Sequence, residues 1–249
     1  MASVGIDIGS HYAKGVLLNG SKILSVSKFR INTDPVTAAE RISADLIKDA
    51  NIQVDRKAVT GMGGQSVSKT FTFFPELVCY ARGAHFLYPS VRTVIAIGAE
   101  SYTIGKINDT GDLIDFGTND KCAAGTGIFI EEMAHALRID ISEMGELSTK
   151  ATQDINMSST CTVFAESEVV SLNHKKIPKE DIARAIFKSI VTRLVSLAKR
   201  IELEKDVVVV GGVAKNIGII RLLEDSLECP VTVPDDPDIT AALGAAILA

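Results

Sequence analysis

The chain has 249 residues, of which 46% are hydrophobic, and its formal net charge is −5 at pH 7. This size and composition suffice for a sizeable core, in one large domain or two smaller ones. The acidic balance and the lack of a long Lys/Arg block argue against nucleic acid as the main partner. No apolar run approaches the roughly 18 residues of a membrane helix, and the first residues lack a signal-peptide pattern. We therefore expect a cytoplasmic protein that does not contact a membrane.

The four cysteines do not indicate a disulfide framework. Cys79, Cys122, Cys161 and Cys229 form no CxxC pair and have no secretory context, so free thiols are expected. Cys79 lies within an apolar helical pattern and Cys229 stands beside Pro230. We interpret these two thiols as structural.

The first 90 residues are predicted to fold in the order β-β-β-α-β-α. Three short runs rich in Val, Ile, Leu or Phe, separated by polar or glycine turns, predict a β-meander. Asp34 is the expected N-cap of the first helix, and Pro35 suits its first position. The expected strands cover residues 3–10, 14–19, 22–29 and 57–64, and the expected helices cover residues 35–50 and 76–88.

The pattern then restarts with a second meander, in which the sequence DTG at 109–111 signals a hairpin. A fully apolar strand, VVVV, follows a series of helices, and another helix closes the chain. The expected strands cover residues 92–98, 101–108, 111–117 and 207–212. The expected helices cover residues 127–139, 142–151, 161–172, 178–204, 214–228 and 239–249.

These patterns predict an α/β protein built from two halves of one topology. We place the first half at residues 1–90 and the second at 91–239, with the final helix, 240–249, packing back onto the first half. No Pro- or Ser-rich linker separates them. The halves are therefore expected to pack across a cleft, which is the natural place for a ligand.

The stretch GIDIGSHYAKG, residues 5–15, is the first candidate for phosphate binding. Asp7 ends a strand, Gly9 and Ser10 form a tight turn whose amides can approach a phosphate, and Lys14 supplies positive charge. Asp7 could bind magnesium through water. A plain hairpin would also explain the glycine, and the residues alone leave both interpretations open.

Two further strand-turn segments point to the same cleft. Gly98 and Ala99 follow the strand at 92–98, and in VVVVGGVAKNIG an apolar strand enters the turn at Gly211 and Gly212 before Asn216 opens a helix. A flat group such as adenine or ribose can lie against bare backbone there. Each segment alone is equally compatible with a tight turn, but the three together favour a nucleotide.

The stretches NDKCAAGTGIF (119–129) and SSTCTVFAESE (158–168) each place a cysteine at the expected start of a helix. A helix N-terminus carries a partial positive charge that favours a thiolate. From the residues alone, Cys122 and Cys161 are either metal ligands or ordinary buried thiols.

Together with the closing PDDPDITAALGAAI, these segments resemble the acetate and sugar kinase/Hsp70/actin superfamily, which has two RNase H-like domains around a nucleotide cleft. They resemble more closely the ATPase activators of 2-hydroxyacyl-CoA dehydratases and the ATP-binding subunits of benzoyl-CoA reductases. The resemblance covers essentially the whole chain, and the two cysteine segments are its specific part.

The resemblance implies ATP and ADP as ligands, Mg²⁺, and a homodimer with one bridging 4Fe-4S cluster ligated by Cys122 and Cys161 of each subunit. It also implies that Gly125, Thr126 and Gly127 face the nucleotide phosphates and connect them to the cluster. The implied partners are an iron-sulfur dehydratase or reductase and an electron donor such as ferredoxin or flavodoxin.

One segment departs from the pattern. Activators of this kind typically read DIGGQD where this chain reads AIGAES, with Ala96 in place of an aspartate and Glu100 in place of a glutamine. The missing carboxylate would help to hold magnesium, and the amide would position the attacking water. We expect Asp7 and Glu100 to carry these roles, with slow hydrolysis.

The function that these observations predict is ATP-driven delivery of a low-potential electron to a partner acting on acyl-CoA thioesters. Two alternatives stay open. A small-molecule kinase of the same superfamily would contain no iron and would respond to a small acceptor. A nucleotide-binding regulatory subunit with weak ATPase activity would bind ATP tightly without releasing phosphate.

Overall fold

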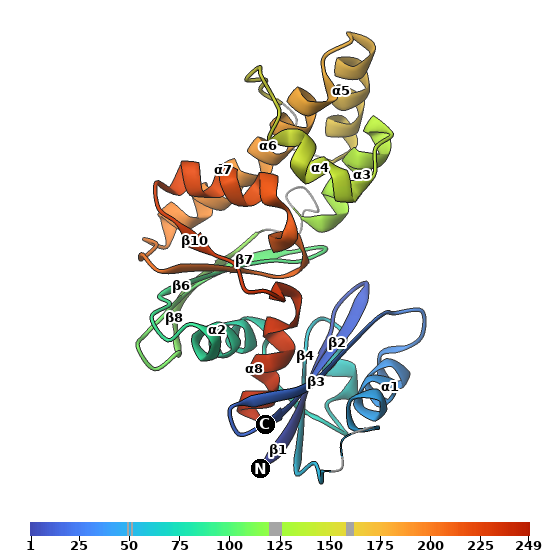
Figure 1. Ribbon diagram of the computed structural model, residues 1–249, viewed down its shortest axis with the longest axis vertical. Helices are drawn as coiled ribbons and strands as arrows, with labels where there is room; N and C mark the ends of the chain where they lie inside the picture. The colour runs from blue at the N-terminus through green and yellow to red at the C-terminus, as the bar shows by residue number, and fades with distance from the viewer. Residues whose placement is uncertain (49, 51, 120–125, 158–161) are drawn as a thin grey trace.

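The computed structural model describes residues 1–48, 50, 52–119, 126–157 and 162–249, which form two mixed β-sheets and the helices that cover them (Figure 1). The first sheet has the strand order β3-β2-β1-β4-β5. Its strands are β1 (Ala2–Ile8), β2 (Tyr12–Asn19), β3 (Lys22–Arg30), β4 (Arg56–Thr60) and β5 (Thr72–Phe73).

The second sheet repeats this arrangement in the order β10-β9-β6-β7-β8. Its strands are β6 (Thr93–Ile97), β7 (Tyr102–Ile107), β8 (Leu113–Thr118), β9 (Val207–Val210) and β10 (Val231–Thr232). In each sheet the first strand pairs antiparallel with the second and parallel with the fourth. The two halves therefore share one topology, which confirms the predicted α/β fold class.

The helix α1 (Pro35–Ile47) covers the first sheet and begins as predicted. Asp34 Oδ1 accepts hydrogen bonds from the backbone N–H groups of Val36 and Thr37, at 3.0 Å each. Such a cap satisfies N–H groups that the helix itself leaves unpaired. A short 3₁₀ helix, η1 (Gly64–Val67), follows β4.

The helices α2 (Glu76–Leu87) and α8 (Thr240–Leu248) lie between the two sheets (Figure 1). A Cβ atom on Gly244 would lie 1.8 Å from the carbonyl oxygen of Cys79, so glycine is required where these helices cross. Ser3 Oγ of β1 also donates a hydrogen bond of 2.6 Å to the carbonyl oxygen of Ala246. The last helix therefore packs on the first sheet, while the domain limits remain a proposal.

The remaining helices cover the other face of the second sheet and extend away from the first sheet (Figure 1). They are α3 (Gly127–Leu137), α4 (Ile141–Ser148), α5 (Thr162–His174), α6 (Lys179–Arg200) and α7 (Ile217–Leu227). Two 3₁₀ helices, η2 (Gly212–Lys215) and η3 (Pro237–Ile239), follow β9 and precede α8, and η3 contacts β2 of the first sheet. Phe129, Met133 and Phe187 are fully buried in their shared core. In the described part of the chain, no helix is long and apolar enough to cross a membrane.

Candidate functional site

A cavity of about 650 Å³ opens between the two sheets and is lined by residues of both halves. This volume lies within the range of small-ligand pockets. Nine residues that the sequence singled out line it, namely Gly9, Ser10, Lys14, Gly98, Ala99, Glu100, Gly127, Gly212 and Asn216. The cavity thus brings together the three strand-turn segments.

The two meanders turn at the cavity in the same way. The backbone N–H of Gly9 donates to the carbonyl oxygen of Tyr12 at 3.1 Å, and the N–H of Gly98 donates to that of Ser101 at 2.8 Å. When the two meanders are aligned on these turns, Asp7 of the first half corresponds to Ala96 of the second, and Lys14 corresponds to Thr103. The repeat therefore allows the chemistry of the two halves to be compared position by position.

Asp7 and Lys14 form a buried ion pair beneath the first turn. Lys14 Nζ lies 2.9 Å from Asp7 Oδ2, and the Asp7 side chain is fully buried. Burial alone would lower the pKa of Lys14, but Asp7, together with Glu76 and Asp238, outweighs this effect and the pKa is raised. Gly61, with a φ of 86°, makes room for the carboxylate, because a Cβ atom there would lie 2.3 Å from Asp7 Oδ1.

Asp7 Oδ1 is buried and has no hydrogen-bond partner among the described residues. Leaving a buried carboxylate oxygen unpaired is costly unless water or an ion satisfies it. Oxygen ligands and retained water molecules are typical of magnesium sites. The residues present therefore fit a hydrated Mg²⁺ ion at Asp7.

The corresponding position of the second half offers no carboxylate. Ala96 is 3% exposed and packs in an apolar cluster with Val94, Val208 and Val210. Glu100, by contrast, is exposed and lines the cavity. At these two corresponding positions, therefore, only the first half has a carboxylate, Asp7, while the second half contributes Glu100 four residues further on.

The sequence reasoning missed Glu76 and Tyr80 of α2, which also line the cavity. Burial, together with repulsion from Asp7, raises the pKa of Glu76 from 4.5 to about 7. Glu76 also forms a hydrogen bond with Tyr80. An acidic residue in the first turn of a helix is common, so the sequence offered no separate signal for Glu76.

The turn after β9 approaches the cavity as predicted, although its two glycines differ. Gly211 has a φ of 91°, and a Cβ atom there would lie 2.4 Å from the carbonyl oxygen of Ile97, so this glycine serves the turn. A Cβ atom on Gly212 would face open space. Asn216 caps α7, since its Oδ1 accepts from the N–H groups of Gly218 and Ile219.

The start of α3 rests directly on the turn of the second meander. The N–H of Gly127 donates to the carbonyl oxygen of Gly98, and that of Ile128 to the carbonyl oxygen of Ala99, both at 3.0 Å. Thr126 is fully buried behind this contact and does not line the cavity. The turn of the second meander and α3 therefore form one unit.

The predicted ligands Cys122 and Cys161, and the predicted phosphate contact Gly125, lie outside the described residues. Among the residues that are described, no group of three or more His, Cys, Asp or Glu side chains is placed to hold a metal ion. Cys79 is buried and Cys229 half-buried, and both are free thiols. Their structural role stays a prediction.

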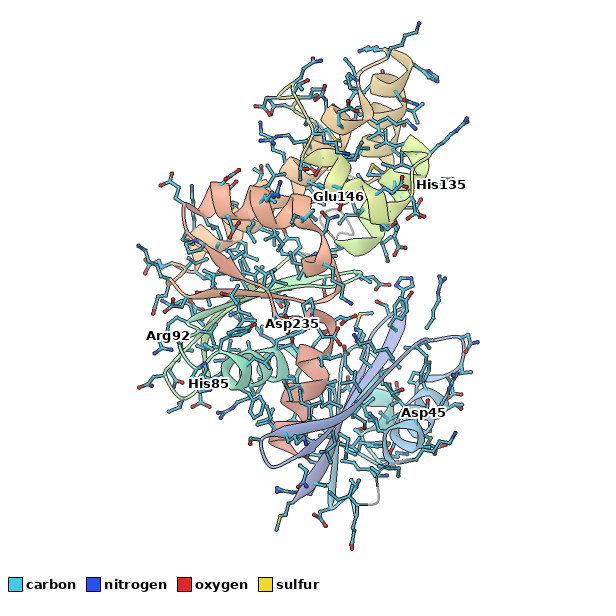
Figure 2. The ribbon with its side chains drawn as sticks, in the orientation of Figure 1. Asp45, His85, Arg92, His135, Glu146 and Asp235 are labelled. Atoms are coloured by element: carbon cyan, nitrogen blue, oxygen red, sulfur yellow. The ribbon has the colours of Figure 1, made fainter. Side chains whose placement is uncertain are left out.

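Residues of α4 and two lysines also line the cavity, and the sequence reasoning missed them as well. Ile141, Ser142, Gly145 and Glu146 line it from α4, and Lys28 and Lys215 line it from β3 and η2. Figure 2 labels Glu146 among the helices of the second half. The segment before α4 carries no glycine-rich motif, so only the folded chain brings this helix to the cavity.

Two sheets of one topology around a shared cavity define the fold class of two-domain ATPases and sugar kinases. The fold is shared with a ROK family glucokinase from Streptomyces griseus, solved with glucose and AMPPNP, at a TM-score of 0.63 and 14% identity, over 100% of this chain and 99% of that one. A model of the BadF/BadG/BcrA/BcrD ATPase family matches residues 4–249, and the chain belongs to this family.

Similar proteins include two dehydratase activators. The 2-hydroxyisocaproyl-CoA dehydratase activator of Clostridioides difficile is 39% identical over 100% of this chain and 95% of its own length. The (R)-2-hydroxyglutaryl-CoA dehydratase activating ATPase of Acidaminococcus fermentans is 38% identical over 99% and 96%. A structure of the former activator with bound ADPNP matches with a TM-score of 0.92 and 40% identity, over 100% of this chain and 94% of that one.

Proposed function

We propose that this protein is an ATP-dependent activator that delivers a low-potential electron to a partner 2-hydroxyacyl-CoA dehydratase or a related acyl-CoA reductase. The observation that carries the proposal is the cavity between two matched glycine turns, in a chain that belongs to an ATPase family over residues 4–249. The named relatives, which activate such dehydratases, support the choice of partner.

In this proposal the phosphates of ATP or ADP lie between the two meander turns. Backbone N–H groups and the Lys14 ammonium are the expected phosphate contacts. The residues proposed to surround the phosphates are Gly9, Ser10, Lys14, Gly98, Ala99, Gly125, Thr126 and Gly127. Those proposed to surround the nucleoside are Gly211, Gly212 and Asn216. Because Thr126 is buried, its part is to fix the start of α3 rather than to touch the ligand.

Asp7 and Glu100 are the proposed catalytic residues. Asp7 would hold Mg²⁺ through a water molecule at its unpaired Oδ1. Glu100, on the opposite side of the cavity, would orient the attacking water. The bound metal would neutralise charge on the transferring phosphoryl group.

Cys122 and Cys161 are the proposed ligands of one 4Fe-4S cluster per homodimer, each subunit supplying two thiolates. Both cysteines lie outside the described residues, so this part rests on the sequence and the family. When bound, the cluster would supply one-electron redox chemistry at low potential. Cys122 stands four residues before Thr126, and α3 rests on the phosphate-facing turn, so a change at the nucleotide can reach the cysteine segment through α3.

We further propose that the protein works in the cytoplasm, where ferredoxin or flavodoxin supplies the electron. No nucleic acid or membrane is part of the proposal. The acidic net charge supports the exclusion of nucleic acid.

The test combines the protein, reduced with dithionite in the absence of oxygen, with a purified 2-hydroxyacyl-CoA dehydratase and its substrate. Dehydration is expected to require this protein, ATP and reductant together, and phosphate release is expected to accompany it. Dehydration that proceeds equally without ATP would contradict the proposal. Phosphate release stimulated by a small acceptor, with no effect on the dehydratase, would instead support a kinase.

A regulatory subunit with weak ATPase activity is the second candidate, and one observation favours it. Ala96 lies in an apolar cluster at the position that corresponds to Asp7, so the second half contributes no carboxylate at that point. This candidate predicts tight ATP binding without phosphate release, even with the reduced protein and its partner present.

A further inference from the structure

The chain crosses from the second half to the first through the segment between β10 and α8. Figure 2 shows the labelled Asp235 of this segment between the two sheets. The segment is also hydrogen-bonded to the turn after β9, because the N–H of Gly211 donates to the carbonyl oxygen of Pro237 at 2.9 Å. Any change in the distance between the halves must therefore act on this crossing.

Two aspartates of the crossing segment contact one lysine from each half. Lys28 of β3 pairs with Asp236, and its Nζ lies 2.8 Å from Asp238 Oδ1. From the other half, Lys215 Nζ lies 2.9 Å from Asp238 Oδ2 and 3.7 Å from Asp236 Oδ1. The four side chains balance in charge and link the first sheet to η2 of the second half.

This cluster forms part of the cavity wall. Lys28, Lys215 and Asp238 line the cavity, and the Asp238 side chain is only 16% exposed. An isolated exposed ion pair contributes little, whereas a network around a partly buried carboxylate is screened less and holds its geometry better. Its position at the cavity, with one lysine from each half, suits it to hold the cleft closed.

We infer that Lys28, Asp236, Asp238 and Lys215 form an ionic clasp that holds the two halves together around a bound nucleotide and slows its release. The inference rests on the proposed nucleotide binding in this cavity. Opening the cleft separates Lys28 from the crossing segment or the crossing segment from Lys215. The clasp therefore adds to the barrier for nucleotide release without contacting the phosphates.

The test measures the dissociation rate of a fluorescent ADP analogue from the full chain by stopped flow, at low and at high KCl. Lys28→Met and Asp238→Asn are each expected to speed release about fivefold, which corresponds to about 1 kcal/mol. High salt is expected to speed release from the unmodified protein more than from either variant, because the clasp is already weakened in the variants.

Lys188→Met is the matched control. Lys188 Nζ lies 2.6 Å from Asp154 Oδ1 within the second half, and the exposure of its side chain, 36%, is close to the 29% of Lys28. This variant is expected to leave the release rate unchanged. Circular dichroism of all three variants checks that they remain folded.

Whether Asp238→Asn speeds or slows nucleotide release distinguishes the clasp from a simpler role, in which the two lysines bind the phosphates directly. If Asp238 instead competes with the phosphates for Lys28 and Lys215, its removal slows release, and that result would overturn the clasp. Unchanged release in both variants would overturn it as well, while leaving nucleotide binding intact. A protein that binds no ADP analogue at all would overturn the proposed function and the clasp together.

Discussion

Lys14 Nζ lies 2.9 Å from Asp7 Oδ2, and the second half has Thr103 and Ala96 at the corresponding positions. The two halves therefore share a topology and a glycine turn but differ in charge at the cavity. The buried Asp7 carboxylate is held by one lysine, and its other oxygen is left for water or an ion. This asymmetry supports the proposal that Mg²⁺ binds at the first half.

Replacing Asp7 with Asn is expected to reduce Mg²⁺-dependent phosphate release by about 100-fold or more, because the variant lacks the charge that holds the hydrated metal. The variant also leaves the ammonium of Lys14 without its partner, so its melting temperature should fall. Phosphate release measured across a series of Mg²⁺ concentrations tests the first effect. Thr103→Val, at the position of the second meander that corresponds to Lys14, serves as the control and should stay within about twofold. Normal magnesium dependence in Asp7→Asn would refute the assignment.

The raised pKa of Glu76 predicts a pH dependence of stability. In the folded protein this pKa is about 7, against an ordinary value of 4.5, so between these values the folded state binds more protons than the unfolded state. Stability contributed at this position is therefore lost as the pH rises through this range. Glu76→Gln removes the free-energy cost of ionising a buried carboxyl group. It should therefore stabilise the nucleotide-free protein more at pH 8 than at pH 5.

Urea unfolding at both pH values measures this difference. Glu40→Gln, at an exposed position of α1, provides the control. If Glu76→Gln changes the free energy of unfolding by the same amount at pH 5 and pH 8, the burial of an ionisable Glu76 is the wrong account.

Variants of Glu100 test whether its side chain orients the attacking water. Glu100→Ala is expected to lower kcat for ATP hydrolysis by at least about tenfold while KM stays within about twofold. Glu100→Gln is expected to raise kcat above that of the unmodified protein, because an amide orients water without placing a negative charge beside the phosphates. Steady-state hydrolysis separates kcat from KM. An alanine variant as fast as the unmodified protein would remove Glu100 from the mechanism.

The two described cysteines should differ in reactivity. Burial raises the pKa of Cys79 to about 12, and its side chain is fully buried, whereas Cys229 is half-buried. In the Cys122→Ser/Cys161→Ser variant, iodoacetamide at pH 8 should modify Cys229 and leave Cys79 unmodified. Mass spectrometry counts the modified sites, and labelling in urea provides the control in which both react. Equal labelling of both thiols in the folded protein would contradict this packing.

Much of the fold follows from local patterns in the sequence. The apolar residues of KILSVSKF, bounded by polar and glycine residues, predict β3, and Asp34 with Pro35 marks the start of α1. The strands β5 and β10 were missed, because each has two residues and pairs only with a parallel strand. Such pairing depends on partners distant in sequence, and two residues cannot show a periodicity.

The residues of the candidate site likewise fall into those that local sequence patterns predict and those that they do not. The turns at Gly9, Gly98 and Gly212 could be predicted, since a strand that ends in glycine leaves a local signature. Glu76 and Asp238 could not, because an acidic residue near a helix start is ordinary in sequence. Their importance arises from neighbours on other elements, such as Asp7 for Glu76 and Lys28 for Asp238.

The most direct test of the central claim is the iron and acid-labile sulfide content of protein purified without oxygen, with molar mass from light scattering. We predict a dimer with about four irons and four sulfides. The cluster should be lost in both Cys122→Ser and Cys161→Ser, and retained in Cys229→Ser. An iron-free protein that also fails to take up a cluster on reconstitution would contradict the electron-transfer account and leave a kinase or a nucleotide-dependent regulator.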